Sequence, residues 1–252
     1  MSRDRPGRLH ALGCPVDRYS ASDLRARFPE IASGERLTHL VTLNPEQVML
    51  ARKDSNVRAI IDSAEIVTAD GVGITIALRL RGVAATDRIT GVEIVDWIAE
   101  DGLPVYFLGG KDGVAQSAAA RLSERHPAAQ ITGYWSGGTP DPRFDGESIR
   151  RIADTRACVV CVAYGAPGQL RWIERNRRPL FDAGVRLAIG VGGSLDYHGG
   201  ASKAAPRLIR KIGLEWLVRL IREPWRWRRQ RVLPIFALLA IREAIQVRLA
   251  AR

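Results

Sequence analysis

Asp70, Thr42 and Asn44 are polar residues at or directly after the ends of short apolar stretches, where they can take part in acid–base chemistry. A carboxylate at the mouth of a ligand site can accept a proton from a hydroxyl nucleophile, and Asp70 is placed for that role. Thr42 and Asn44 can add hydrogen bonds in the same site. The alternatives are structural: Asp70 can be the N-cap of the helix that follows, and Thr42 and Asn44 can form the turn before Pro45.

Glycines follow several of the same apolar stretches, and they predict a phosphate-binding site. Glycine allows backbone N–H groups and helix N-termini to come close to a phosphate oxygen. These glycines are Gly71, Gly73, Gly109, Gly110, Gly165, Gly168, Gly190, Gly192 and Gly193. We therefore expect a phosphorylated ligand.

Known cofactor and metal motifs are incomplete in this sequence. The two G-x-G sequences lack the third glycine of a dinucleotide fingerprint, because Ile76 and Leu195 stand in its place. Cys158 and Cys161 have the spacing of a redox or metal pair, but their apolar neighbours favour two small buried side chains. We expect no metal and no cofactor, and a nicotinamide-dependent oxidoreductase is the weaker enzyme alternative.

The elements that must position these residues alternate along the chain. Beyond an irregular start, strands are expected at 37–43, 65–69, 104–108, 130–134, 158–163 and 186–191, and amphipathic helices lie between them. Nearly all-apolar strands in this alternation predict an α/β fold, with a mostly parallel Rossmann-like sheet and helices on both faces. Such sheets bind ligands beyond the carboxyl ends of their strands, where the polar residues and glycines lie.

The C-terminal fifth of the chain is strongly basic. Residues 203–252 contain 13 basic and 3 acidic residues and carry +10 of the net charge of +11. We expect a catalytic body over 1–205 and a basic, amphipathic helical appendage over 206–252.

Arginines in the appendage recur at helical spacing, at positions 219, 222, 226 and 229, although Pro224 interrupts the pattern. Trp216, Trp225 and Trp227 lie among them. Arginine beside tryptophan and apolar residues favours an anionic membrane surface. A nucleic-acid-binding module that uses the same basic segment is the weaker alternative.

Nothing in the sequence predicts a membrane-spanning helix. The longest apolar run covers 232–241, about half of the roughly 20 residues that a spanning helix needs. The N-terminus lacks the apolar core of a signal peptide, and the three cysteines are an odd number. We expect a cytoplasmic protein that lies peripherally on the inner face of the cell membrane.

Taken together, the motifs resemble the WecG/TagA/CpsF family of bacterial glycosyltransferases (glycosyltransferase family 26). The resemblance runs from about residue 13 to residue 231. Its most specific pieces, in the family's order, lie at 42–46, 69–73, 88–91, 107–111, 165–169, 190–196, and 213–219 with 223–226.

The resemblance implies metal-independent, inverting transfer of a sugar from a UDP-sugar to a polyprenyl-diphosphate-linked saccharide. Asp70 matches the family's proposed general base, and Thr42, Asn44, Arg88 and Gln169 match other active-site positions. Gly109, Gly110, Gly165, Gly192 and Gly193 are expected to bind the donor phosphates. Arg219, Arg226 and Arg229 match tail arginines that fold over the site and stabilise the diphosphate.

The resemblance leaves the substrate open and is imperfect at two positions. N-acetylmannosamine, its uronic acid and glucose remain the possible donor sugars. Leu170 stands where many relatives carry Glu, and Ala204 stands at a commonly basic position. Homo-oligomers formed through the apolar tail in the absence of membrane are a further expectation.

Overall fold

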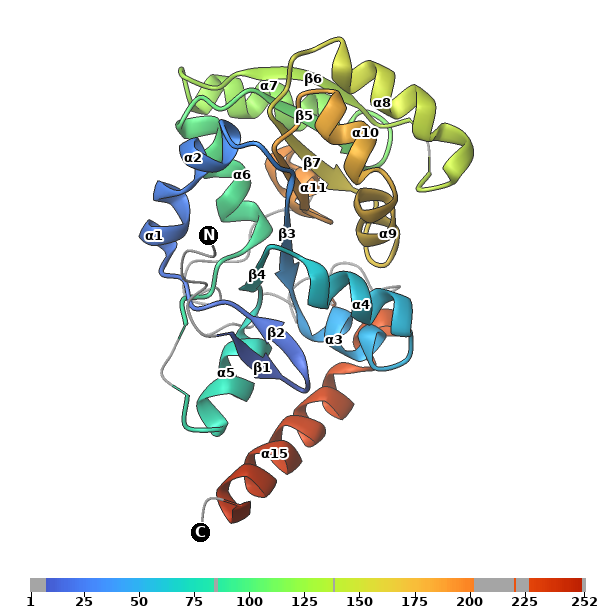
Figure 1. Cartoon of the computed structure of the whole chain (residues 1–252). Coiled ribbons are helices and arrows are strands. Elements are labelled where there is room, and N and C mark those ends of the chain that lie inside the picture. The colour runs from blue at the N-terminus through green and yellow to red at the C-terminus, as the bar shows by residue number, and fades with distance from the viewer. Residues whose placement is uncertain (1–7, 84–85, 138, 202–219, 221–226, 251–252) are drawn as a thin grey trace.

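The computed structural model describes residues 8–83, 86–137, 139–201, 220 and 227–250 of the 252-residue chain (Figure 1). Its centre is a six-stranded, all-parallel sheet in the order β4-β3-β8-β7-β5-β6. The strands are β3 (Thr38–Leu43), β4 (Ile66–Ala69), β5 (Val105–Gly109), β6 (Ile131–Trp135), β7 (Val159–Ala163) and β8 (Leu187–Gly190). The parallel α/β sheet predicted from the sequence is confirmed.

Helices cover both faces of this sheet, because alternate strand residues point to opposite sides. One face carries α1 (Ala21–Ala26), α2 (Phe28–Ala32), α6 (Gly91–Glu100), α7 (Val114–Arg125) and α11 (Ser194–His198). The other carries α3 (Pro45–Ala51), α4 (Ser55–Ser63), α5 (Val72–Leu80), α8 (Asp145–Ala153), α9 (Gly168–Arg175) and α10 (Arg177–Asp182). A short 3₁₀ helix, η1 (Pro142–Phe144), precedes α8. The core therefore consists of one buried cluster on the first face and two on the second.

The first thirty residues are more regular than the sequence indicated. β1 (Leu9–Ala11) and β2 (Cys14–Val16) form an antiparallel hairpin whose turn residues, Leu12 and Gly13, have positive φ angles. The carboxylate of Asp17 accepts hydrogen bonds from the Val67 N–H at 2.8 Å and from Arg8 at 2.9 Å. These bonds attach the hairpin to β4, the edge strand of the main sheet.

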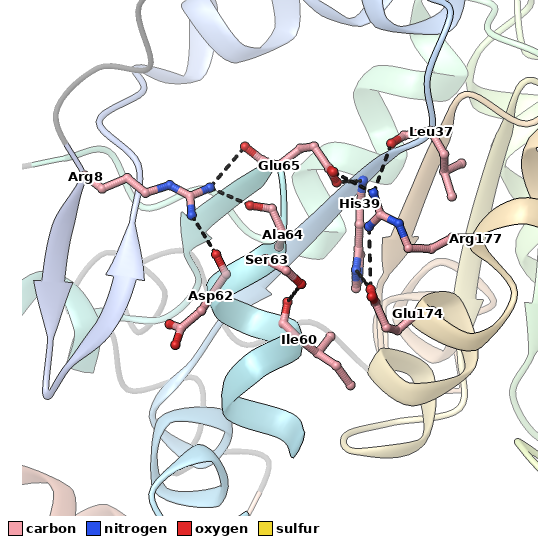
Figure 2. A network of polar contacts seen from close by, with 10 residues as sticks. All are labelled: Arg8, Leu37, His39, Ile60, Asp62, Ser63, Ala64, Glu65, Glu174 and Arg177. Atoms are coloured by element: carbon pink, nitrogen blue, oxygen red, sulfur yellow. Dashed lines mark hydrogen bonds and ion pairs between the residues drawn. The ribbon is translucent and has the colours of Figure 1, made fainter. Parts of the chain in front are cut away.

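A polar network ties the hairpin, the sheet and α10 together at the end of the sheet where β3 and β4 begin (Figure 2). Glu65 accepts from the His39 N–H at 2.8 Å and pairs with Arg177 at 2.6 Å. Arg8 donates to the carbonyl oxygens of Ala64 and Glu65 at 2.5 and 3.2 Å. The network lies at the opposite end of the strands from Asp70, so its role is structural.

The C-terminal helices are α14 (Trp227–Gln230) and α15 (Leu233–Ala250), and α15 packs on the outside of the body against α5 and α3 (Figure 1). Phe236 is buried there. Glu243 Oε2 accepts from the Leu12 N–H at 3.2 Å and lies 3.7 Å from Arg81. The opposite side of α15 exposes Ile235, Leu238, Ile241, Ile245 and Leu249. Among the described helices, none is long and apolar enough to cross a membrane.

Candidate active site

The segments that leave the neighbouring strands β3 and β8 go to opposite faces of the sheet. The helices that follow β3 pack on one face of the sheet, whereas α11, which follows β8, packs on the other face against α6 and α7. The segments leaving the two strands therefore diverge. Ligands of open α/β sheets bind at such a switch point, beyond the carboxyl ends of the strands.

Thr42 and Gln169 fix the backbone that leaves β8. Thr42 Oγ1 donates to the carbonyl oxygen of Gly190 at 3.2 Å, and Gln169 Oε1 accepts from the Gly192 N–H at 3.0 Å. Both side chains are buried, with exposed fractions of 4 % and 3 %. An ideal Cβ on Gly190 would lie only 2.5 Å from Gln169 Nε2, so a larger residue at this position would displace the Gln169 side chain.

Asn44 is the N-cap of α3, whereas the structural alternative for this residue was a turn before Pro45. Its Oδ1 accepts from the Gln47 N–H at 3.0 Å, while Gln47 Oε1 accepts from the Asn44 N–H at 3.2 Å. This reciprocal pair is a capping box. The Nδ2 group of Asn44 is the part of the side chain suited to donate to a ligand.

Asp70 lies beside the exit of β3. Its backbone N–H donates to the Leu43 carbonyl oxygen at 2.7 Å, and the residue is half-buried. The N-cap of α5 is Gly71, with a φ of 95° and no side-chain capping bond. The N-cap alternative for Asp70 is therefore wrong.

Arg88 lies next to the end of β4 although the two are far apart in the sequence. Residues 69 and 88 form an isolated parallel bridge, and the Ile89 N–H donates to the Ala69 carbonyl oxygen at 3.0 Å. Thr68 Oγ1 adds a bond to the Ile89 carbonyl oxygen at 3.2 Å. This extra extended segment places Arg88 beside the residue that precedes Asp70.

Gly91 and Ser194 bring a further pair of segments together at the site. An ideal Cβ on Gly91 would meet Ser194 Oγ at 2.8 Å. The start of α6 therefore packs directly on the turn after β8. Gly91 and Ser194 belong to the motifs at 88–91 and 190–196. Because these motifs are far apart in the sequence, their contact could not be predicted from the spacing of residues within either one.

The predicted phosphate-binding glycines do not all lie together. Gly192 and Gly193 follow β8 and adjoin the Thr42 and Gln169 side of the site, and Gly165 follows the neighbouring β7. Gly109 ends β5 and Gly110 follows it, and β5 is four strands away from β4 and Asp70. At about 4.8 Å per strand this separation is roughly 19 Å. The structure thus gathers one group around β4, β3 and β8 and leaves Gly109 and Gly110 farther along the sheet edge.

The remaining predicted positions are the tail arginines and the two positions at which the sequence departs from the family pattern. Arg219 and Arg226 lie outside the described residues, as does Ala204, and Arg229 is described only by its backbone within α14. Leu170 is buried among the apolar residues of β3, β4 and α4. Its side chain therefore belongs to the core and does not face a donor.

The cysteines and acidic residues provide no reactive or metal-binding cluster within the described parts of the chain. Cys161 and Cys14 are buried, and burial raises the pKa of both thiols, that of Cys14 to about 11. A thiol with a raised pKa is a poor nucleophile and metal ligand at neutral pH. These cysteines act as small core residues.

Comparison with known proteins identifies the chain. A model of the glycosyl transferase WecG/TagA/CpsF family matches residues 9–250. The chain belongs to this family. It is a glycosyltransferase, the class that the motifs indicated.

Two curated relatives carry the same name, N-acetylglucosaminyldiphosphoundecaprenol N-acetyl-beta-D-mannosaminyltransferase. The protein of Bacillus subtilis is 32 % identical over 206 residues, which cover 80 % of this chain and 78 % of the relative. The protein of Bacillus spizizenii is 31 % identical over 207 residues, which cover 81 % of this chain and 78 % of the relative. Both names describe transfer of an N-acetylmannosaminyl group to a sugar on a polyprenyl diphosphate.

Proposed function

We propose that this enzyme transfers N-acetylmannosamine from a UDP-sugar to N-acetylglucosamine linked to a polyprenyl diphosphate, in the synthesis of a bacterial surface polysaccharide. The names of the two relatives favour this donor sugar over its uronic acid and over glucose. The observation that carries the proposal is the placement of Asp70, Arg88 and the turn after β8 around the switch point of the sheet.

The proposed reaction is an inverting displacement. A hydroxyl oxygen of the acceptor attacks the anomeric carbon and gives its proton to the Asp70 carboxylate. The bond between the anomeric carbon and the β-phosphate oxygen breaks on the opposite side, and UDP leaves with the bonding electron pair. One C–O bond forms and one breaks, so the anomeric configuration inverts.

Negative charge grows on the β-phosphate as UDP departs, and fixed dipoles and cations lower the energy of that state. The glycines of the turn over 191–194, which Thr42 and Gln169 hold in place, leave room for a phosphate to approach the backbone. Arg88 can add a permanent, bidentate cation. We propose that Arg219, Arg226 and Arg229 complete the phosphate site from the tail.

We further propose that the C-terminal segment holds the enzyme on an anionic membrane surface at the cytoplasmic face. Two features support this: residues 203–252 carry most of the net charge, and α15 exposes an apolar side although it is already docked on the body. Apolar and cationic residues together suit the headgroup region of such a membrane. Off the membrane, the same exposed side can self-associate.

Transfer assays with Asp70→Asn test the proposal, with Asp182→Asn as the matched control because Asp182 is an exposed partner of Arg178. Loss of the base is expected to lower kcat by about 10² or more, while the affinity for UDP stays within about twofold. Nuclear magnetic resonance of the wild-type product should show an inverted anomeric centre. Full activity of Asp70→Asn would remove Asp70 as the base, and a retained configuration would exclude the direct displacement.

A further inference from the structure

His198 occupies a buried position between three helices on the side of the sheet where α11 packs. It is the last residue of α11, and its side chain is 0 % exposed. Its Nε2 lies 3.1 Å from the Val92 carbonyl oxygen in α6, and its Nδ1 lies 2.8 Å from Arg125 Nη2 in α7. A guanidinium group can only donate, so Nδ1 accepts the proton of Arg125 and Nε2 donates to Val92. This arrangement requires the neutral ring.

The three helices joined at His198 include two whose first residues form the candidate site. α11 begins directly after the turn that carries Gly192 and Gly193, and α6 begins three residues after Arg88. Their starts are in contact, since Gly91 has no room for a Cβ beside Ser194. Ser194 Oγ also donates to the Val191 carbonyl oxygen at 2.7 Å. A shift of α11 relative to α6 would therefore move the turn relative to Arg88.

We propose that His198 is a positioning residue that locks the turn over 191–194 to the Arg88 segment, so that donor binding requires the neutral imidazole. The proposal rests on the function proposed above, because it assigns the turn to the donor phosphates. His198 itself touches neither substrate nor the reacting atoms.

Protonation of His198 would weaken the contacts by which it holds α11 against α6 and α7. A proton on Nδ1 would place two donors, the imidazolium and Arg125, against each other. The charged groups around the ring are Arg125 and His126 from α7 and Asp96 from α6, with Asp96 Oδ1 3.8 Å from Nδ1 and 3.3 Å from Arg125 Nη1. Burial is the largest cause that lowers the pKa of His198, and it outweighs the attraction of Asp96. The neutral form therefore persists at physiological pH and is lost in acid.

Two variants separate positioning from bulk stability. His198→Gln retains a side-chain amide that can donate to the Val92 carbonyl oxygen and cannot be protonated, whereas His198→Leu keeps the volume without hydrogen bonds. His126→Gln is the matched control, because His126 is a neighbouring histidine whose Nε2 pairs with Asp96 at 3.2 Å.

Calorimetric binding of UDP to the full-length proteins at about pH 8 and about pH 5 tests the proposal, together with hydrogen exchange of residues 191–195 without ligand. At the higher pH we expect about tenfold weaker binding by His198→Leu and near wild-type binding by His198→Gln and His126→Gln. At the lower pH the wild type should lose more affinity than His198→Gln. Titration of the UDP phosphate affects both proteins equally, so their ratio isolates the histidine.

The outcomes distinguish this inference from the proposed function. Equal UDP affinity of all variants at both pH values, with unchanged exchange over 191–195, would overturn the positioning role. A second outcome is that the wild type does not bind UDP, while the amide hydrogens of residues 191–195 still exchange faster in His198→Leu than in the wild type. The positioning role of His198 would then hold, and the assignment of the turn to the donor phosphates would fail.

Discussion

Gly190 shows how one residue type can fix the geometry of the site. The residue ends β8 and receives the hydroxyl proton of Thr42, while the side chain of Gln169 fills the space where a Cβ would stand. Its place after an apolar strand predicted a position next to a phosphate. Its contact with Gln169 joins residues 21 positions apart in the sequence, so only the folded chain reveals why glycine is needed.

We expect Gly190→Ala to lower the free energy of unfolding by about 1 to 3 kcal/mol, because the new methyl group overpacks a buried side chain. UDP binding should weaken as Gln169 moves from the Gly192 N–H. Gly146→Ala is the control, since its Cβ would meet nothing within 4 Å on α8, and it should be neutral or stabilising by up to about 1 kcal/mol. Urea denaturation of both variants makes the comparison. Wild-type stability and UDP affinity of Gly190→Ala would contradict the assigned packing.

His39 gives the fold a predictable sensitivity to acid. Burial, with a smaller contribution from Arg177, lowers its pKa to about 3, whereas the unfolded chain protonates near the ordinary value of 6.5. The unfolded state therefore binds more protons between these values, and the stability present above about pH 6.5 is lost as the pH falls.

Comparison of the wild type with His39→Leu by urea denaturation tests this sensitivity. The wild type should lose on the order of 1 kcal/mol more per pH unit than the variant as the pH falls below 6.5. His126→Gln serves as a control, because His126 is partly exposed and pairs with Asp96. Parallel pH dependences of the wild type and His39→Leu would exclude His39 as the cause.

Among the secondary-structure elements, the apolar strands of the main sheet could be predicted from the sequence. The short strands of the β1–β2 hairpin and the packed side of α15 could not. The strands of the main sheet were expected to within one residue of their ends because each is a largely apolar run. The hairpin of β1 and β2 was missed because each strand has three residues and its Leu12-Gly13 turn is not a common hairpin sequence. Such elements become visible only through their contacts with β4.

The helix α15 illustrates a second limit of sequence reasoning. Phe236 and Leu238 lie in the same apolar run, but Phe236 is buried at 4 % exposure and Leu238 is exposed at 67 %. Phe236 lies near Gly73, whose ideal Cβ would come 3.5 Å from the ring and 2.6 Å from Pro45. The apolar residues of α15 itself point to several sides of the helix, so the sequence alone does not identify the side that packs on the body.

Substitutions on the two sides of α15 should therefore have different effects. Phe236→Ala is expected to destabilise the protein by about 3 kcal/mol, because it leaves a cavity between α15, α3 and α5. Leu238→Gln should leave stability within about 0.5 kcal/mol of wild type but weaken binding to anionic vesicles. Thermal unfolding and vesicle sedimentation measure the two effects. Equal vesicle binding by Leu238→Gln and the wild type would contradict a membrane role for the exposed side.

In the molecule as a whole, most of the net charge and the polar groups proposed for chemistry lie in different parts of the chain. Residues 203–252 carry +10 of the net charge of +11, whereas the polar groups proposed for chemistry lie at the switch point of a nearly neutral body. Strand order could not be read from the sequence, because the alternation of strands and helices does not say which strands are neighbours. That order brings Asp70, Arg88 and Gly192 to adjoining strand ends and keeps Gly109 and Gly110 apart from them.

Calorimetric titration of UDP into the wild type and Asp70→Asn, each with and without magnesium, tests the central claim most directly. The account predicts tight UDP binding that does not depend on magnesium and survives the substitution, since Asp70 acts on the acceptor. Failure of the well-folded wild type to bind UDP would contradict a UDP-sugar site at this switch point. Binding lost only in Asp70→Asn would place Asp70 at the donor and contradict its assignment as the base.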